Sequence, residues 1–238
     1  ATQGKILFCG EDLTQASEPR MRQIRGSEIS MIFQEPMTSL NPLHTIEQQI
    51  AEMLLLHNVV PKDQVRSRVL DLLNKVQIPD AEKRLKSYPH ELSGGQRQRV
   101  MIAMSLACNP KILIADEPTT ALDVTTQAEI LKLLQNLQKE YGMSMIFITH
   151  DLNVVQKIAD RVVVMKDGKV REVGATQQIF KSPKDLYTQQ LLSAEPSGVP
   201  HKVERDAHTC ISAKDIKVHF PIKKGLFRRT VDSIQAVD

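Results

Sequence analysis

ILIADE at residues 112–117 is a short apolar run that ends in two adjacent carboxylates, Asp116 and Glu117. A continuous apolar run bounded by polar residues is typical of a strand buried on both faces of a parallel sheet. A similar run, SMIFIT, occupies 144–149, and a helical apolar pattern fills about 124–140 between the two. Strand, helix and strand at this spacing predict a βαβ unit, and therefore an α/β fold with a mostly parallel sheet.

Further elements are predicted on both sides of this unit. The segments 4–9 and 29–33 are strand candidates toward the N-terminus. Apolar residues at helical spacing predict helices between 45 and 86 and another over 94–108. A helix is also expected near 151–158.

The C-terminal part changes character. The tetrapeptide KDGK at 166–169 is a hairpin turn signal between two expected strands. Residues 193–210 are rich in Pro, Ser and charge and lack periodicity, which predicts a linker. Apolar and polar residues then alternate over 216–220, which predicts a strand, but 211–238 is too short to build a core of its own.

Composition excludes several classes of protein. Hydrophobic residues make up 41% and charged residues 25% of the 238 residues, as in ordinary globular chains. No apolar run approaches the roughly 18 residues of a membrane-spanning helix. Residues 1–198 carry 23 basic and 23 acidic side chains, so the net charge of +3 lies in the tail, which argues against a basic nucleic-acid-binding surface. The three distant cysteines support neither a zinc site nor a disulfide framework.

The carboxylates that follow the predicted 111–115 strand are the first candidate site. Ligands of open α/β sheets bind beyond the carboxyl ends of the strands. There, Asp116 is suited to hold Mg²⁺ beside a nucleotide phosphate, and Glu117 to orient or deprotonate an attacking water. The alternative is a pair of surface carboxylates without chemistry.

Three further polar motifs stand at comparable positions. Ser93, Gly94, Gly95 and Gln96 open the 94–108 helix, where exposed N–H groups favour an anion; the alternative is a glycine turn with a serine cap. His150 follows the 144–149 strand on the same predicted edge as Glu117, where it can donate to a phosphate oxygen. The alternative is that His150 belongs to the start of the next helix and has no role in the chemistry. Gln34 follows the 29–33 strand, where its amide can reach a metal or a water.

Together these motifs resemble one family. Gln34 in IFQEP, LSGGQ at 92–96, ILIADEP at 112–118, Ala121-Leu122-Asp123 and His150 match, in order and spacing, the nucleotide-binding domain of ATP-binding-cassette (ABC) proteins. The resemblance covers 1–192 and implies an α/β P-loop NTPase fold with a helical subdomain at about 45–110.

The resemblance also implies a role for each matching residue. ATP and Mg²⁺ are the expected cofactors. Asp116 and Gln34 are the expected metal ligands, Glu117 is the catalytic glutamate and His150 is the switch histidine. Ser93, Gly94, Gly95 and Gln96 are expected to bind the γ-phosphate of ATP held by a partner domain. Asp123, which matches the D-loop aspartate, is a further expected nucleotide-binding residue, as is Gln34.

One element of the family pattern is missing. No G-x-x-x-x-G-K-[ST] phosphate loop occurs in the 238 residues. We therefore expect an ABC domain truncated at its N-terminus over 1–192, and a fragment that does not turn over ATP by itself. Residues 211–238 resemble the opening strands of a second such domain in the same chain.

A narrower resemblance is to the peptide-importer branch of ABC ATPases, carried by IFQEPMTSLNPLHTI and by the SPKDLYTQQLLSAEPSG stretch. It implies an ATP-hydrolysing subunit, peripheral on the cytoplasmic face of the inner membrane, that energises uptake of peptides or peptide-like solutes. The implied partners are transmembrane permease subunits, a second nucleotide-binding domain and, indirectly, an extracytoplasmic solute-binding protein, with no nucleic acid. Nickel or another small solute, a non-transport ABC ATPase, and a catalytically silent interaction module are the alternatives.

Overall fold

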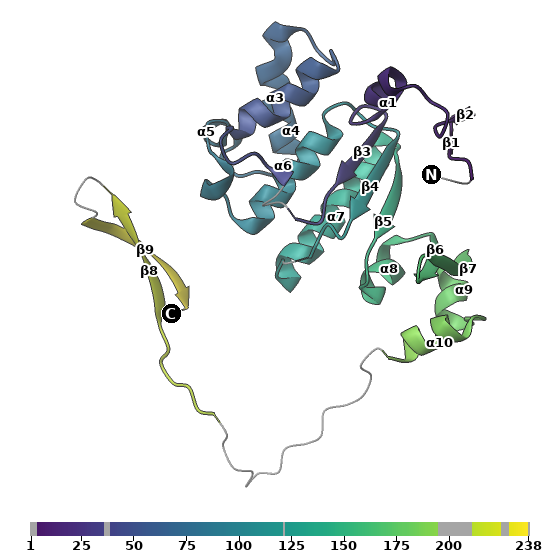
Figure 1. Ribbon diagram of the computed structural model, residues 1–238. Coiled ribbons are helices and arrows are strands. Elements are labelled where there is room, and N and C mark those ends of the chain that lie inside the picture. Colours follow the sequence, from purple (N-terminus) through teal and green to yellow (C-terminus); the bar gives the residue numbers. More distant parts are fainter. Residues whose placement is uncertain (1–3, 36–38, 121, 195–210, 225–228, 238) are drawn as a thin grey trace. The chain divides into compact units, whose positions relative to one another are not determined.

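The computed structural model describes residues 4–35, 39–120, 122–194, 211–224 and 229–237 (Figure 1). The chain divides into two units, Ala1–Ala194 and Glu195–Asp238. Most of the expected linker, residues 195–210, lies outside the described residues.

A three-stranded parallel sheet forms the centre of the first unit. Its strands are β3 (Ile29–Ile32), β4 (Ile112–Asp116) and β5 (Ser144–Ile148), hydrogen-bonded in that order. The helix α7 (Val124–Tyr141) connects β4 to β5 and begins with Asp123 as its N-cap. The predicted βαβ unit is confirmed, and β4 is the middle strand (Figure 1).

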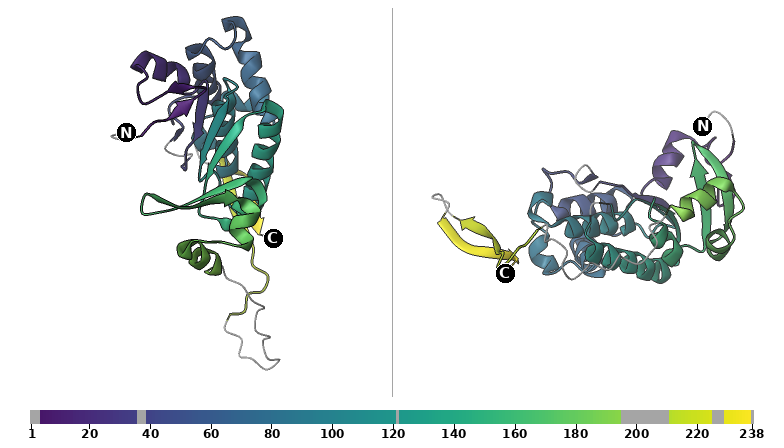
Figure 2. Two further views of the ribbon diagram at one scale, coloured as in Figure 1. Left: turned by 90° about the vertical axis from the view of Figure 1, so that its right-hand side faces the viewer. Right: turned by 90° about the horizontal axis from the view of Figure 1, so that it is seen from below.

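One expectation about this sheet is wrong: β4 and β5 are not buried on both faces. Leu113 and Ala115 of β4 are fully buried against the main core, whereas Ile146 and Ile148 of β5 are 52% and 46% exposed on the other side of the pleat. The reason is that, within the described residues, the helices of the main core cover β4 and β5 on one face only (Figure 2).

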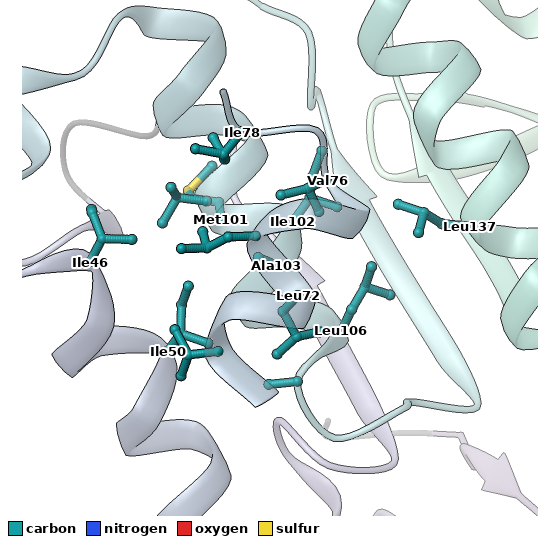
Figure 3. Packing of buried hydrophobic residues seen from close by; sticks show 14 of the residues in the cluster. Ile46, Ile50, Leu72, Val76, Ile78, Met101, Ile102, Ala103, Leu106 and Leu137 are labelled. Atoms are coloured by element: carbon teal, nitrogen blue, oxygen red, sulfur yellow. The ribbon is translucent and has the colours of Figure 1, made fainter. Parts of the chain in front are cut away.

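A group of helices adjoins that covered face through its last member, which contacts β3 and on which the first two pack. It contains α3 (Ile46–Leu56), α4 (Val65–Lys75), α5 (Ala81–Arg84) and α6 (Gly94–Leu106), with 3₁₀ turns at Lys62–Gln64 and Pro89–Glu91. These helices confirm the predicted helical pattern. Figure 3 shows their apolar side chains meeting α7 in one cluster, which includes Ile46, Ile50, Leu72, Ile102, Leu106 and Leu137.

The N-terminal segment differs in detail from its prediction. The strand expected over 4–9 is reduced to β1 (Leu7–Phe8), which pairs with β2 (Glu11–Asp12) across a turn at Gly10. A helix that was not anticipated, α1 (Glu18–Ile24), follows; Ser17 caps it and a proline occupies its first turn.

The remaining elements of the first unit follow β5. They are α8 (Leu152–Ile158), β6 (Arg161–Lys166), β7 (Lys169–Ala175), α9 (Thr176–Lys181) and α10 (Leu186–Ser193). Strands β6 and β7 form the predicted hairpin, and both residues of its turn, Asp167 and Gly168, have positive φ as a type I′ turn requires.

The second unit contains the antiparallel pair β8 (Val218–Lys224) and β9 (Arg229–Val237). Its first strand confirms the strand predicted near 216–220. Across the described parts of both units, every helix is too short or too polar to traverse a lipid bilayer.

Candidate functional site

Glu117 stands where the middle strand ends. Its backbone N–H donates to the carbonyl of Ile148 at 2.9 Å, which extends the β4–β5 pairing one residue past the last strand pair, Asp116 and Ile148. The backbone of Glu117 then turns away from the sheet at φ 44°, in the left-handed region that only a closely fixed turn tolerates. This geometry holds Glu117 beside the segment that carries His150.

The side chain of Glu117 gathers three hydrogen-bonding groups. Gln34 Nε2 donates to Oε2 at 2.8 Å, and His150 Nδ1 lies 3.0 Å from Oε1. Thr120 Oγ1 also donates to Oε2, at 2.9 Å. The structure therefore brings together three residues singled out from the sequence, each of which follows a different strand of the sheet.

Electrostatics favour the ionised form of this carboxyl group. The hydrogen bond with His150, followed by that from Thr120, holds the pKa of Glu117 below its ordinary value. The carboxylate is therefore negative at neutral pH and able to accept a proton.

Asp116 is the last residue of β4 and is partly buried. Within the described residues, no group of three or more His, Cys, Asp or Glu side chains could hold a metal ion. A site with only one or two protein oxygens suits Mg²⁺, which keeps most of its ligands as waters and phosphate oxygens. Asp116 and the amide oxygen of Gln34 fit that description.

The second group of candidate residues opens α6. Ser93 caps the helix: its Oγ accepts from the N–H of Gln96 at 3.3 Å, and its own N–H donates to Gln96 Oε1 at 3.1 Å. The serine cap considered from the sequence is thus present. It orders the helix start and leaves the glycine N–H groups at the positive end of the helix dipole, where an anion is stabilised.

The starts of α6 and α7 share one cavity. Asp123 caps α7 by accepting from the N–H groups of Thr125 and Thr126, and a Cβ on Gly95 would lie 2.7 Å from Thr126 Cγ2. The cavity measures about 490 Å³, and its lining includes all five predicted residues of this group: Ser93, Gly94, Gly95, Gln96 and Asp123. The other lining residues are Gln77, Pro79, Arg99, Leu122, Thr126 and Glu129.

Arg99 was not predicted from the sequence. Its guanidinium donates to the carbonyl of Val76 at 3.0 Å, to Gln77 Oε1 at 3.1 Å and to Glu129 Oε2 at 2.8 Å. It therefore joins the end of α4, α6 and α7 beneath the cavity. A charged residue one turn beyond a glycine-rich helix start is the signal that could have drawn attention to it.

Comparison with known proteins shows which family this chain resembles. The ABC transporter family matches residues 1–120. The peptidoglycan transport ATP-binding protein YejF of Agrobacterium fabrum is 59% identical over 235 residues, which cover 99% of this chain and 43% of that protein. The oligopeptide transport ATP-binding protein OppD of Bacillus subtilis is 55% identical over 194 residues, 82% of this chain and 54% of that protein. The chain thus spans about half the length of these relatives.

Solved structures agree. The dimeric MJ0796, a bacterial ABC transporter cassette, superposes with a TM-score of 0.65 at 32% identity, covering 74% of each chain. CbiO1 from Clostridium perfringens, part of the cbiONQ ABC transporter complex, gives the same TM-score at 34% identity, covering 76% of this chain and 69% of that one. This chain belongs to the ABC transporter family. The expected ABC-type α/β fold is confirmed.

Proposed function

We propose that this chain is part of the ATP-hydrolysing subunit of an ABC importer for peptides or peptide-like solutes. The observation that carries the proposal is the convergence of Gln34 and His150 on the carboxylate of Glu117 at the ends of three adjacent strands. The relatives named for transport of peptidoglycan and oligopeptides support the solute class.

In the proposed reaction Glu117 orients the attacking water and accepts its proton, a role that typically contributes about 10²–10⁴ in rate. His150 holds the Oε1 side of the carboxylate, and in this proposal it also donates to a phosphate oxygen. Asp116 and Gln34 would hold Mg²⁺, which supplies neutralisation of phosphate charge.

The cavity at the starts of α6 and α7 serves a second nucleotide in this proposal. The N–H groups of Gly94 and Gly95, the hydroxyl of Ser93 and the side-chain amide of Gln96 are the proposed donors to the γ-phosphate of ATP held by a partner domain, and Asp123 lies beside them. The structurally similar cassette MJ0796 is described as a dimer in a post-hydrolysis state, bound to ADP and Pi. A second nucleotide-binding domain is therefore the proposed partner.

We further propose the domain organisation that goes with this function. Residues 1–192 form most of one nucleotide-binding domain, 193–210 a linker, and 211–238 the start of a second domain in the same chain. Transmembrane permease subunits are the proposed membrane partners, met at the cytoplasmic face of the inner membrane. An extracytoplasmic solute-binding protein contributes indirectly.

Hydrolysis by the full-length polypeptide, purified with its permease, tests the catalytic part. Glu117→Gln should leave ATP binding intact and reduce kcat at least about a hundredfold, because an amide cannot take the proton from water. The matched change Glu82→Gln, on the exposed surface of α5, should leave kcat unchanged. Undiminished hydrolysis by Glu117→Gln would remove Glu117 from the mechanism.

The solute is tested separately, in vesicles that contain the complex and its solute-binding protein. ATP-dependent uptake of a labelled peptide supports the proposal. Uptake of nickel without peptide, or co-purification with ribosomes in place of permeases, would contradict it.

A further inference from the structure

Thr120 has two hydrogen bonds to the same residue. Its backbone N–H donates to the carbonyl of Glu117 at 3.1 Å, and its hydroxyl donates to Glu117 Oε2 at 2.9 Å. The first bond closes the turn that leads the chain away from β4, and the second fixes the carboxylate within that turn. The geometry of the turn therefore sets the direction of the Glu117 side chain.

The other two partners of Glu117 reach it from distant parts of the chain. Gln34 lies 83 residues away in sequence and follows β3, and His150 lies 33 residues away and follows β5. The side chain of His150 is 76% exposed, whereas that of Glu117 is 22% exposed. The contacts of Glu117 with Gln34 and His150 therefore depend on the relative positions of three strand ends and on two exposed side chains. The contact with Thr120 lies within a single turn and depends on neither.

We propose that Thr120 is a positioning residue, which acts through Glu117 by holding its carboxylate in one orientation through a hydroxyl on Oε2. The inference rests on the proposed role of Glu117 as the base. Oε2 is shared between Thr120 and Gln34, so Thr120 keeps this oxygen anchored whenever Gln34 turns toward another partner. Oε1, on the other side, stays directed at His150.

Loss of this anchor should affect the chemical step. A general base must lie within hydrogen-bond reach of the proton that it removes, and a misplacement of about 1 Å costs up to about a hundredfold in rate. Because Glu117 keeps two other partners, we expect a smaller loss, about tenfold in kcat. Nucleotide affinity should not change, because the hydroxyl of Thr120 is bonded to Glu117 and Thr120 does not line the cavity at the start of α6.

Three substitutions in the full-length subunit test this role. Thr120→Val keeps the shape and removes the hydroxyl; it should lower kcat about tenfold and leave the KM for ATP and the Tm within error. Thr120→Ser keeps the hydroxyl and should restore kcat to within about twofold of the parent. Thr14→Val is the matched control, because Thr14 also donates its hydroxyl to a nearby carboxylate, that of Asp12 at 2.8 Å, but lies in the turn after β2 and not in the cluster around Glu117.

A double substitution separates positioning from general structural support. If Thr120 acts through Glu117, Thr120→Val should cause no further loss in a Glu117→Gln background. Full activity of Thr120→Val, an equal defect in Thr120→Ser, or an additive loss in the double variant would each overturn the inference. If Thr120→Val has a lowered Tm, Thr120→Ala carries the same expectations in its place.

The outcome is distinguishable from failure of the proposed function. Hydrolysis that survives Glu117→Gln would contradict the proposed function whatever Thr120 does. Loss of hydrolysis in Glu117→Gln together with normal rates in Thr120→Val would contradict only the inference about Thr120.

Discussion

Gly95 and Thr126 bring the starts of α6 and α7 close together, since a Cβ on Gly95 would lie 2.7 Å from Thr126 Cγ2. One helical turn further along, Arg99 of α6 meets Glu129 of α7 at 2.8 Å. The two contacts are four residues apart on α6 and three residues apart on α7, so each pair lies on one face of its helix. They fix the glycine N–H groups relative to Asp123.

Gly95→Ala should be destabilising although alanine is the better helix former. Overpacking against the stiff Thr126 costs about 1–3 kcal/mol, which exceeds the gain of up to about 1 kcal/mol in helix propensity. Thr126→Ser removes the offending methyl group and keeps the hydroxyl that donates to Asp123, so the double variant should recover the stability of the parent. Urea denaturation measures both.

Gly94→Ala is the control for this test, because its nearest neighbour, Leu122 Cδ2, lies at an ordinary contact distance of 3.7 Å. Equal destabilisation at Gly94 and Gly95, or no rescue by Thr126→Ser, would contradict the steric explanation.

The ion pair between Arg99 and Glu129 should be strongly asymmetric in its effect on stability. The Arg99 side chain is 10% exposed and that of Glu129 is 59% exposed. Arg99→Met leaves the carbonyl of Val76 without this donor and should cost about 3 kcal/mol in the free energy of unfolding. Glu129→Gln should cost less than about 1 kcal/mol, as at exposed pairs. Equal losses in chemical denaturation would show that the carbonyl contact is unimportant.

Glu172 should make the first unit sensitive to acid. Its carboxylate accepts from the backbone N–H groups of Lys184 at 2.9 Å and Asp185 at 3.1 Å, and these bonds, that from Lys184 first, hold the pKa of Glu172 below its ordinary value of 4.5. The stabilisation is therefore fully present above pH 4.5 and is lost as the pH falls through the lower pKa of the folded state.

Glu172→Gln should accordingly lower the Tm at neutral pH, and the difference from the parent should shrink below pH 4.5. Thermal unfolding followed by circular dichroism across this range gives the answer. A difference in Tm that is independent of pH would mean that ionisation of Glu172 does not contribute to the stability of the folded state.

Two cysteines should differ sharply in reactivity. Burial raises the pKa of the Cys108 thiol to about 11, so roughly one part in a thousand is thiolate at pH 8. Cys9 is exposed. Iodoacetamide should modify Cys9 at least about ten times faster, as followed by peptide mass spectrometry, and urea should remove the difference. Comparable rates in the folded protein would argue against burial of Cys108.

Much of the fold could be predicted from apolar spacing. The parallel strands, the crossover helix α7 and the helices between 46 and 106 follow from patterns set by local burial. The helix α1 was missed because its signals are a cap and a proline rather than a periodic apolar face. The exposure of Ile146 was missed because an apolar run does not reveal how many faces of its strand are covered.

The candidate site was predictable where a residue type follows a strand, as with Gln34, Glu117 and His150. Thr120 could not be found in this way, because its role depends on a turn whose φ angle at Glu117 is positive. The partners of Arg99 could not be predicted for a similar reason: which residues of neighbouring helices meet depends on how the helices pack and not on the spacing within either helix.

The convergence of Gln34 and His150 on Glu117 has a consequence for the order of events during folding. Gln34 and His150 are separated from Glu117 by 83 and 33 residues in sequence. Bringing such distant residues together costs more chain entropy than forming contacts between neighbouring residues within a helix. Folding slows as contacts become more distant in sequence. Helical segments can form early, but the cluster around Glu117 exists only after all three strands have paired, so its contacts report that non-local assembly is complete.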